Sequence, residues 1–370
     1  MPTALKGLKV LDFSTLLPGP FASMYLADMG AEVIHVESPS RPDLVRIMPP
    51  YANGQATAHS YLNRNKQSIA LDLKDAANIE MIRNKISEFD ILLEQFRPDV
   101  MRRLGLDYDT LAEINPRLIY CSITGYGQTG SYKDRAGHDI NYLALAGVSG
   151  HSGRQDGGPP PLGIQIADVA GGSLHAVIGI LAAVVERQRS GMGQYIDISM
   201  TDCVASLNSM AASASLAGQT PQGPEQGMLN GAIFYDYYET KDGRYFSVGS
   251  LEPQFMTGLA AALDLPILMA GSFDPEDRQA IKQALKEKFS SKDFAEWQSI
   301  FSQLDICVEP VLSLDEALTS PIAKQRGWVV NVPLSENTDQ TEPQLACPIK
   351  FSRSQMRYQF IGQGLGQGKW

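Results

Sequence analysis

His138 and Asp168 are the two side chains whose types and positions in this sequence best suit proton transfer. His138 is followed by an apolar segment that ends near Gly147 and Gly150, and Asp168 by a longer apolar segment that reaches residue 185. This periodicity predicts a helix after each residue, with His138 and Asp168 at the two helix starts. Helix starts that follow one another in a chain can direct an imidazole and a carboxylate into one cleft.

The predicted helix after Asp168 is apolar almost all round, so we expect it to be buried. The polar and basic residues 187–193 end it. A carboxylate at a buried helix N-terminus is stabilised by free backbone amides and by the helix dipole. We expect the amides of Asp168 and Val169 to be able to hold an oxyanion that develops on a substrate.

Each of these residues also has a simpler interpretation. Most aspartates before apolar helices only cap the helix, and a single histidine is more often a hydrogen-bonded structural residue than a catalyst. Asp139 competes with Asp168 for the carboxylate role, but it directly follows His138 and should point about 100° away from it on a helix. We therefore interpret Asp139 first as a helix-capping residue.

The composition is that of an ordinary globular protein with room for two domains. The chain has 370 residues, of which 44% are hydrophobic and 19% charged, and its net charge is −10. This acidic balance disfavours nucleic acid and anionic membranes as partners. Four cysteines without a CxxC pair and five histidines without i, i+4 spacing indicate no metal site. The N-terminal residues lack signal-peptide features and no apolar run has membrane-spanning length, so we expect a cytoplasmic protein.

The first two hundred residues alternate between strand and helix patterns. Strand patterns occur at residues 8–13, 32–37, 68–73, 90–94, 118–123 and 194–199. Such alternation predicts an α/β fold whose large domain is Rossmann-like, with a parallel sheet. Ligands of such sheets bind at the carboxyl ends of the strands.

The second half of the chain predicts a smaller domain. Residues 218–231 are rich in glycine, proline and polar residues, which indicates a linker. Beyond it, Asp242 and Gly243 stand between two strand patterns, which is typical of a hairpin, and three helix patterns follow. We predict a large domain over residues 1–217, a linker over 218–231, a small α+β domain over 232–320, and a C-terminal segment over 321–370 that returns to the large domain or crosses to a partner.

A glycine-rich loop follows the strand pattern that ends at Ile123. Residues 125–130 match G-x-G-x-x-G, but the loop continues into the polar residues 131–135 instead of an apolar helix. A nicotinamide-dependent dehydrogenase is therefore disfavoured. We interpret the glycines as positions where the backbone can approach a ligand, with a plain tight turn as the alternative.

Seven stretches carry a resemblance to a known family. They are residues 5–12, 17–20, 30–34, 63–68, 96–98, 125–130 and 193–197. Together and in this order they resemble the family III CoA-transferase superfamily (CaiB/BaiF type), which includes formyl-CoA transferase, the carnitine CoA-transferases and α-methylacyl-CoA racemase. The resemblance implies an interlocked homodimer, in which the small domain of one chain covers the large-domain cleft of the other.

Two further stretches resemble the racemase branch. In residues 137–143, His138 corresponds to one of the racemase's two catalytic bases, and in residues 249–255, Glu252 corresponds to the glutamate that pairs with that histidine. Asp168 corresponds to an aspartate that is the second base in the racemase and a covalent carrier in the transferases. The resemblance therefore implies a racemase that inverts the α-carbon of 2-methylacyl-CoA thioesters through an enolate. A CoA-transferase and a CoA-binding protein without turnover are the alternatives, and Glu252 also fits a plain helix N-terminal acid.

The resemblance implies coenzyme A as part of the substrate and no required cofactor. The predicted substrate-binding residues are Arg97, Arg103, Tyr126, Gly127, Gln128, Thr129 and Arg41. We expect the arginines near the CoA phosphates and the glycine-rich loop near the pantetheine, although such arginines are often solvated surface charges. The racemase tends to have an arginine at the end of the second strand, where this chain has Ser38 with Arg41 and Arg46 nearby.

Overall fold

The computed structural model describes residues 2–270 and 275–370, which divide into two units. The larger unit comprises Met1–Ala146, Leu162–Leu207 and Pro321–Trp370, and the smaller unit comprises Gly147–Pro161 and Asn208–Ser320. The predicted large domain runs uninterrupted to residue 217, whereas residues 147–161 and 208–217 lie in the smaller unit. Salt bridges that no local pattern reveals hold the first of these segments there, because Arg154 pairs with Glu225 and Asp236.

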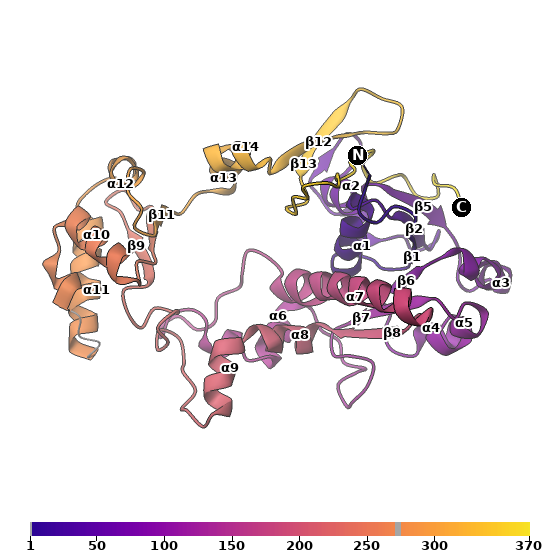
Figure 1. Ribbon diagram of the computed structural model, residues 1–370, viewed down its shortest axis with the longest axis horizontal. Coiled ribbons are helices and arrows are strands. Elements are labelled where there is room, and N and C mark those ends of the chain that lie inside the picture. The colour runs from indigo at the N-terminus through magenta and orange to yellow at the C-terminus, as the bar shows by residue number, and fades with distance from the viewer. Residues whose placement is uncertain (1, 271–274) are drawn as a thin grey trace. The chain divides into compact units, whose positions relative to one another are not determined.

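A six-stranded parallel sheet forms the centre of the larger unit (Figure 1). In the order β5-β2-β1-β6-β7-β8, its strands are β5 (Lys66–Ala70), β2 (Glu32–Glu37), β1 (Lys9–Asp12), β6 (Ile91–Glu94), β7 (Ile119–Thr124) and β8 (Tyr195–Ser199). The central strands β6 and β7 are buried along their whole length, as expected of a parallel sheet covered on both faces. The predicted strand at residues 68–73 begins earlier, at Lys66, because this residue pairs in register with Val33 of β2. Its side chain is buried and donates to the Pro20 carbonyl.

Helices and two short hairpins surround this sheet. They are α1 (Pro18–Asp28), η1 (Leu44–Ile47), α2 (Thr57–Leu62), α3 (Ala76–Lys85), η2 (Ile86–Glu88), α4 (Val100–Leu104), α5 (Tyr108–Ile114), α6 (Asp139–Leu145), η4 (Ala167–Leu174), α7 (His175–Ser190), α8 (Met200–Leu207) and α14 (Pro321–Arg326), with hairpins β3 (Tyr51–Ala52) to β4 (Gln55–Ala56) and β12 (Val329–Pro333) to β13 (Thr341–Leu345). One core cluster joins Leu11 and Leu92 of the sheet to Ile82, Met101 and Leu111 of α3, α4 and α5.

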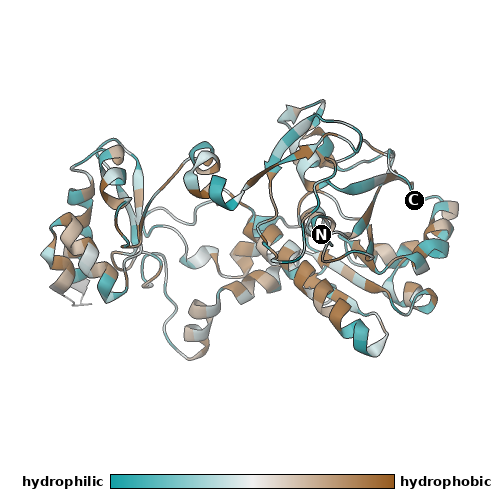
Figure 2. Ribbon diagram, turned by 45° about the horizontal axis from the view of Figure 1, so that its top comes forward, coloured by the Kyte–Doolittle hydropathy of each residue, from teal (hydrophilic) through white to brown (hydrophobic). Residues whose placement is uncertain are grey.

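The helix after Asp168 begins as the π-helical segment η4 and continues as α7. One face of α7 packs on the sheet, where Gly179 leaves room for Ile196, but Ile178 and Val185 on the same helix are 63% and 51% exposed. The prediction that this helix is buried on all sides is therefore wrong for the single chain, although the helix is largely apolar (Figure 2). Among the described residues, Ala167–Ser190 is a helical segment whose length and composition would suit a membrane span, a test that core helices of globular proteins also pass.

The smaller unit combines a three-stranded antiparallel sheet with helices. Its strands, in the order β11-β10-β9, are β11 (Val308–Pro310), β10 (Tyr245–Val248) and β9 (Asp236–Glu239), and its helices are η3 (Ser149–His151), α9 (Ser209–Leu216), α10 (Pro253–Leu263), η5 (Pro266–Ala270), α11 (Pro275–Phe289), α12 (Phe294–Phe301) and α13 (Leu314–Thr319). Phe246, Phe289 and Trp297 belong to its aromatic core. The predicted hairpin forms as β9 and β10. Residues 200–216, before the predicted linker, contain two helices, α8 and α9.

Candidate active site

His138 and Asp168 line one cavity of the larger unit, which has a volume of about 270 Å³. The segments that follow β6 and β7, residues 95–98 and 125–126, form part of its wall. The cavity therefore lies at the carboxyl ends of parallel strands, where the fold is expected to bind its ligand. The structure thus brings the two predicted proton-transfer groups together.

His138 is the N-cap residue of α6, and its side chain is exposed. Its amide donates to Oδ1 of Asn141 at 3.0 Å, and its carbonyl accepts from the Asn141 amide at 2.8 Å. The Tyr142 hydroxyl donates to the Gly137 carbonyl at 2.6 Å. A Cβ atom at Gly125 or Gly137 would lie only 2.5 or 2.6 Å from the Tyr142 ring, so both glycines are needed for this packing. The backbone that carries the imidazole is therefore fixed on both sides.

Asp168 is the second residue of η4, and two predictions about its surroundings are wrong. Asp139 is not the cap of α6, because His138 holds that position, and Oδ1 of Asp139 accepts from the Asp168 amide at 3.0 Å. The Val169 amide donates to the Gln165 carbonyl at 3.0 Å. Because both amides already have acceptors within the protein, they are not free to hold a substrate oxyanion.

The carboxyl of Asp168 titrates close to neutrality. Its burial and the nearby Asp139 carboxylate raise its pKa to about 6, and only His138 acts in the opposite direction. A carboxyl with such a pKa can both accept and donate a proton at physiological pH. The electrostatics of the cavity therefore suit acid–base chemistry.

The glycine-rich loop lines this cavity and also a second one of about 490 Å³. Tyr126 lines the first cavity, whereas Gln128 and Thr129 line the second. Gly127 has a positive φ of 81°, and the Gln128 amide after it donates to Asp197 at 3.0 Å. The predicted pantetheine loop is therefore divided between two cavities.

Among the predicted arginines, only Arg97 reaches these two cavities, and it lines both. Its guanidinium donates to the Asp134 carbonyl at 2.8 Å. Arg103 is exposed in the last turn of α4 and Arg41 is exposed in the loop after β2, and neither is among the described residues that line the two cavities. In α4, Arg102 lines the second cavity and Arg103 does not.

Two basic residues of the first cavity were not predicted from the sequence. Lys133 and Arg135 line it, and both belong to the polar segment after the glycine-rich loop. Lys133 pairs with Asp99 at 2.7 Å, and the Arg135 guanidinium lies 4.2 Å from the centre of the Tyr132 ring. The signal that could have revealed them was basic residues directly after a loop interpreted as ligand-binding.

Glu252 lies in the smaller unit, as the exposed N-cap residue of α10. Pro253 follows it as the first residue of the helix. The position agrees with the simpler interpretation of Glu252 as an acid at a helix N-terminus. The pairing of Glu252 with a histidine stays a prediction.

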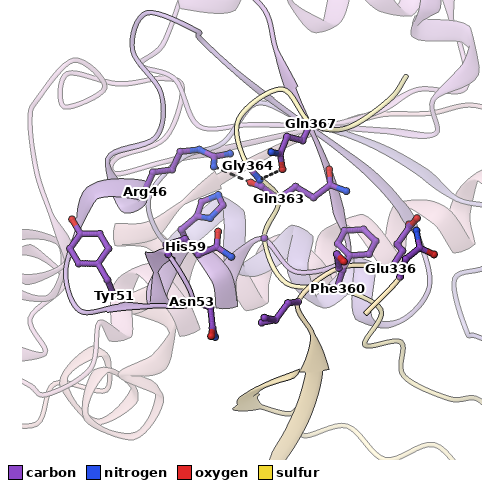
Figure 3. A pocket seen from close by; sticks show the side chains of 15 residues that line it. Arg46, Tyr51, Asn53, His59, Glu336, Phe360, Gln363, Gly364 and Gln367 are labelled. Atoms are coloured by element: carbon purple, nitrogen blue, oxygen red, sulfur yellow. Dashed lines mark hydrogen bonds between the residues drawn. The ribbon is translucent and has the colours of Figure 1, made fainter. Parts of the chain in front are cut away.

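A larger cavity, of about 530 Å³, lies elsewhere in the larger unit (Figure 3). Arg46 and His59 line it together with the C-terminal tail, including Gln363. The Arg46 guanidinium is already engaged, because it donates to Glu37, to the Ser68 hydroxyl and to the Gln363 carbonyl. None of the predicted site residues lines this cavity, and Arg46 already has partners within the protein. We therefore do not assign the active site to it, although it is larger than the cavity of His138 and Asp168.

Comparison with known proteins decides the family. The sequence model of CoA-transferase family III matches residues 5–366. The chain belongs to CoA-transferase family III.

Relatives within family III include both racemases and transferases. The chain is 41% identical to mouse α-methylacyl-CoA racemase, with 85% of this chain and 79% of the racemase covered. It is 33% identical to human succinyl-CoA:glutarate CoA-transferase, with 89% of this chain and 76% of the transferase covered. A CaiB/BaiF family protein from Brucella suis has the same fold, with a TM-score of 0.86 at 30% identity over 99% of this chain and 97% of the other.

The residue types of the site agree with acid–base or acyl-transfer chemistry. In residues 2–270 and 275–370 no group of three or more histidines, cysteines, aspartates and glutamates is arranged to hold a metal ion. The side chains that the cavity does offer are an imidazole, a carboxyl, two tyrosines and several cationic groups.

Proposed function

We propose that this family III protein is a racemase that inverts the α-carbon of 2-methylacyl-CoA thioesters. The observation that carries the proposal is the shared cavity of His138 and Asp168. One group removes the α-proton from one face of the substrate, and the other delivers a proton to the opposite face of the planar enolate. Because the thioester carbonyl takes up the negative charge, the reaction requires no redox or metal cofactor. The identity to named racemases supports the same reaction.

Stabilisation of the enolate must supply most of the rate enhancement. An acid–base group contributes on the order of 10²–10⁴-fold per proton transfer, which is only part of what such a reaction needs. The amides of Asp168 and Val169 are engaged within the protein. Neither amide is therefore free to stabilise the enolate oxygen, and another donor must supply this stabilisation.

The two bases must begin the reaction in different protonation states. A pKa of about 6 for Asp168 allows it to share one proton with the imidazole as a coupled pair. Each direction of racemisation then starts from a different protonation state of that pair. For CoA, we assign Arg97, Lys133 and Arg135 to the phosphates or the pantetheine, because all three line the cavity.

We further propose a homodimer in which Glu252 of one chain approaches His138 of the other. Apolar side chains exposed on α6 and α7 support a partner surface; they are Ile140, Leu145, Ile178 and Val185. Glutamate beside the imidazole would fix its tautomer and favour its charged form. Sedimentation of the enzyme as a monomer under assay conditions contradicts this arrangement.

One incubation tests the reaction. The wild-type enzyme is mixed with a single enantiomer of a 2-methylacyl-CoA in deuterated water, and the product is analysed by mass spectrometry and chiral separation. A racemase incorporates one deuteron at the α-carbon and yields both enantiomers.

A parallel incubation tests the transferase alternative, which the named transferase relatives support. The enzyme receives an acyl-CoA donor and a free carboxylic acid. In a transferase, Asp168 attacks the acyl-CoA carbonyl, CoA leaves and then displaces the acid, and an aspartyl-CoA thioester remains. Transfer of CoA together with a mass adduct at Asp168, without deuterium exchange, overturns the racemase proposal.

A further inference from the structure

We infer that Glu94 is a positioning residue for the substrate-binding turn of residues 95–98, and that its ionised form strengthens the binding of acyl-CoA. The inference rests on the proposed function, since it takes the cavity of His138 and Asp168 as the acyl-CoA site. Glu94 is the last residue of β6, and only 3% of it is exposed.

The Glu94 carboxylate accepts two hydrogen bonds. One oxygen accepts from the Phe96 amide at 2.7 Å, and the other accepts from the Ser122 hydroxyl. Ser122 lies directly opposite Glu94 in the pairing of β6 with β7, and its hydroxyl accepts from the Tyr195 hydroxyl at 3.1 Å. Glu94 is therefore linked to β7 through Ser122 and, beyond it, to β8 through Tyr195. Its other oxygen fixes the turn through the Phe96 amide.

The turn that Glu94 holds is part of the wall of the catalytic cavity. All four of its residues, 95–98, line that cavity. Oε1 of Gln95 accepts from the Gly19 amide at 2.9 Å, which ties the turn to the start of α1. Phe96 stands between this anchor and Arg97, the cationic residue that lines both cavities. A change in the bond from the Phe96 amide therefore acts on the position of Arg97.

The surroundings of Glu94 contain other titratable groups but no bonded cation. The titratable groups around it are Tyr120 and Cys121 on β7, Tyr195 and Asp197 on β8, and Arg97, Asp99, Arg102, Asp107, Tyr108 and Asp109, which line the second cavity together with Glu94. Among the described residues, no lysine, arginine or histidine forms an ion pair with Glu94. Burial raises the pKa of Glu94 to about 7 and Asp197 adds to the rise, against the hydrogen bonds from Ser122 and Phe96.

The protonation state of Glu94 consequently changes in the neutral range. An amide bond to a carboxylate is charge-assisted and stronger than the same bond to a neutral carboxylic acid. Protonation therefore loosens the turn, and we expect the dissociation constant of acyl-CoA to rise roughly threefold to tenfold between pH 8 and pH 6.

Binding is measured by calorimetry with a thioether analogue of 2-methylacyl-CoA between pH 6 and pH 8.5. All proteins carry Asp168→Asn, so that the catalytic carboxyl does not titrate, and the ligand phosphates contribute equally to every measurement. Glu94→Gln should bind with the affinity that the Glu94 protein shows near pH 6, and with a flatter pH dependence. Asp109→Asn is the matched control, because it removes an exposed carboxylate from the same second cavity.

An unchanged pH dependence in Glu94→Gln overturns the inference, and so does an equal flattening in Asp109→Asn. A second variant separates positioning from a merely structural role. Ser122→Ala removes one donor from the carboxylate, so the pH at which affinity falls should move upward, with affinity unchanged at high pH. Uniformly weaker binding at every pH would show a structural role only.

The outcome does not depend on turnover. If the wild-type enzyme shows no α-proton exchange while Glu94→Gln still flattens the pH dependence of binding, the racemase proposal fails and the positioning role stands. If exchange occurs and the binding curves of the two proteins coincide, the positioning role fails alone.

Discussion

Two pairs of buried or half-buried carboxyl groups, one in each half of the parallel α/β unit, differ in their partners. At the ends of β1 and β2, Asp12 lies 3.6 Å from Lys66 and Glu37 pairs with Arg46. Asp168 lies at the catalytic cavity and Glu94 at the end of β6. Among the described residues, His138 is the one imidazole or cation that lowers the pKa of Asp168, and none lowers the pKa of Glu94. Asp12 and Glu37 thus have cationic partners, whereas Asp168 and Glu94 lack a strong one.

For Asp12 and Glu37 the cationic partners decide the direction of the pKa shift, whereas burial raises the pKa of Asp28 although it pairs with Arg64. Burial alone would raise the pKa of Asp12 and Glu37, but Lys66 and His35 lower the pKa of Asp12 and Arg46 lowers that of Glu37 to about 2. Burial raises the pKa of Asp168 to about 6 and that of Glu94 to about 7. Asp12 and Glu37 therefore stay charged at neutral pH, whereas Asp168 and Glu94 can exchange protons.

Removal of a catalytic base should have the largest effect. We expect Asp168→Asn and His138→Gln each to lower, by about 10³-fold or more, the rate of α-proton exchange from the enantiomer whose α-proton faces the removed base, because the base that abstracts this proton is lost. The rate is measured as deuterium incorporation into a 2-methylacyl-CoA. Glu113→Gln, an exposed change on α5, is the control. Retention of exchange within tenfold in Asp168→Asn would exclude Asp168 as a base.

Removal of a paired cation from the other half should change stability and leave catalysis intact. Lys66→Met leaves the Asp12 carboxylate buried beside an apolar side chain, which we expect to lower the free energy of unfolding by about 3–5 kcal/mol. Urea unfolding at pH 7 measures the loss, with the exposed Lys74→Met as the control. The double variant Asp12→Asn with Lys66→Met should recover part of it. A loss as small as that of Lys74→Met would show that this pair does not stabilise the fold.

The paired and unpaired glutamates should show opposite pH dependence of stability. The depressed pKa of Glu37 gives stability above its ordinary pKa of about 4.5 that is lost as pH falls towards 2, so Glu37→Gln should cost roughly 3 kcal/mol at pH 7 and little near pH 2. The raised pKa of Glu94 reduces stability as pH rises from about 4.5 through 7, so Glu94→Gln should gain roughly 2 kcal/mol at pH 8 and little at pH 4. Chemical unfolding across this range measures both.

The signs of the two changes are the test. A gain for Glu37→Gln at pH 7, or a loss for Glu94→Gln at pH 8, contradicts the assignment of paired and unpaired carboxyls. The gain expected for Glu94→Gln also distinguishes its weaker substrate binding from a general loss of folding.

Local patterns predicted the sheet because each strand and helix carries its own signal. The strand pattern at residues 32–37 matches β2, and the Asp242-Gly243 turn joins β9 to β10. The start of β5 was not predicted because Lys66, a charged residue type, occupies a buried strand position. The place of residues 147–161 in the smaller unit was not predicted because Arg154 pairs with residues more than 70 positions away. Such contacts depend on tertiary structure and produce no periodic pattern in the sequence.

The site was predictable in its members and less so in its contacts. Two helix starts pointed to His138 and Asp168, and they share a cavity. The engagement of the Asp168 amide was not predictable, because its acceptor lies 29 residues earlier in the chain. Glu94 was read only as the end of a strand, since its hydrogen bond to Ser122 depends on the register of β6 with β7.

The smallest expected effect concerns Asp139, which acts on Asp168 both as a charge and as a hydrogen-bond acceptor. Exchange from the enantiomer whose α-proton faces Asp168 should rise as pH increases through about 6, because the ionised carboxylate is the base. Asp139→Asn keeps an acceptor for the Asp168 amide and removes the charge, so the midpoint of this pH–rate profile should fall by up to about one pH unit with little loss of maximal rate.

Asp139→Ala removes the charge and the acceptor together. The midpoint should fall as in Asp139→Asn, and the maximal rate should also drop roughly threefold to tenfold, because the start of η4 loses the bond that fixes the Asp168 backbone. The difference between the two variants measures what the hydrogen bond contributes to placing the carboxyl. A loss of 10³-fold in Asp139→Asn would instead make Asp139 itself a proton-transfer group.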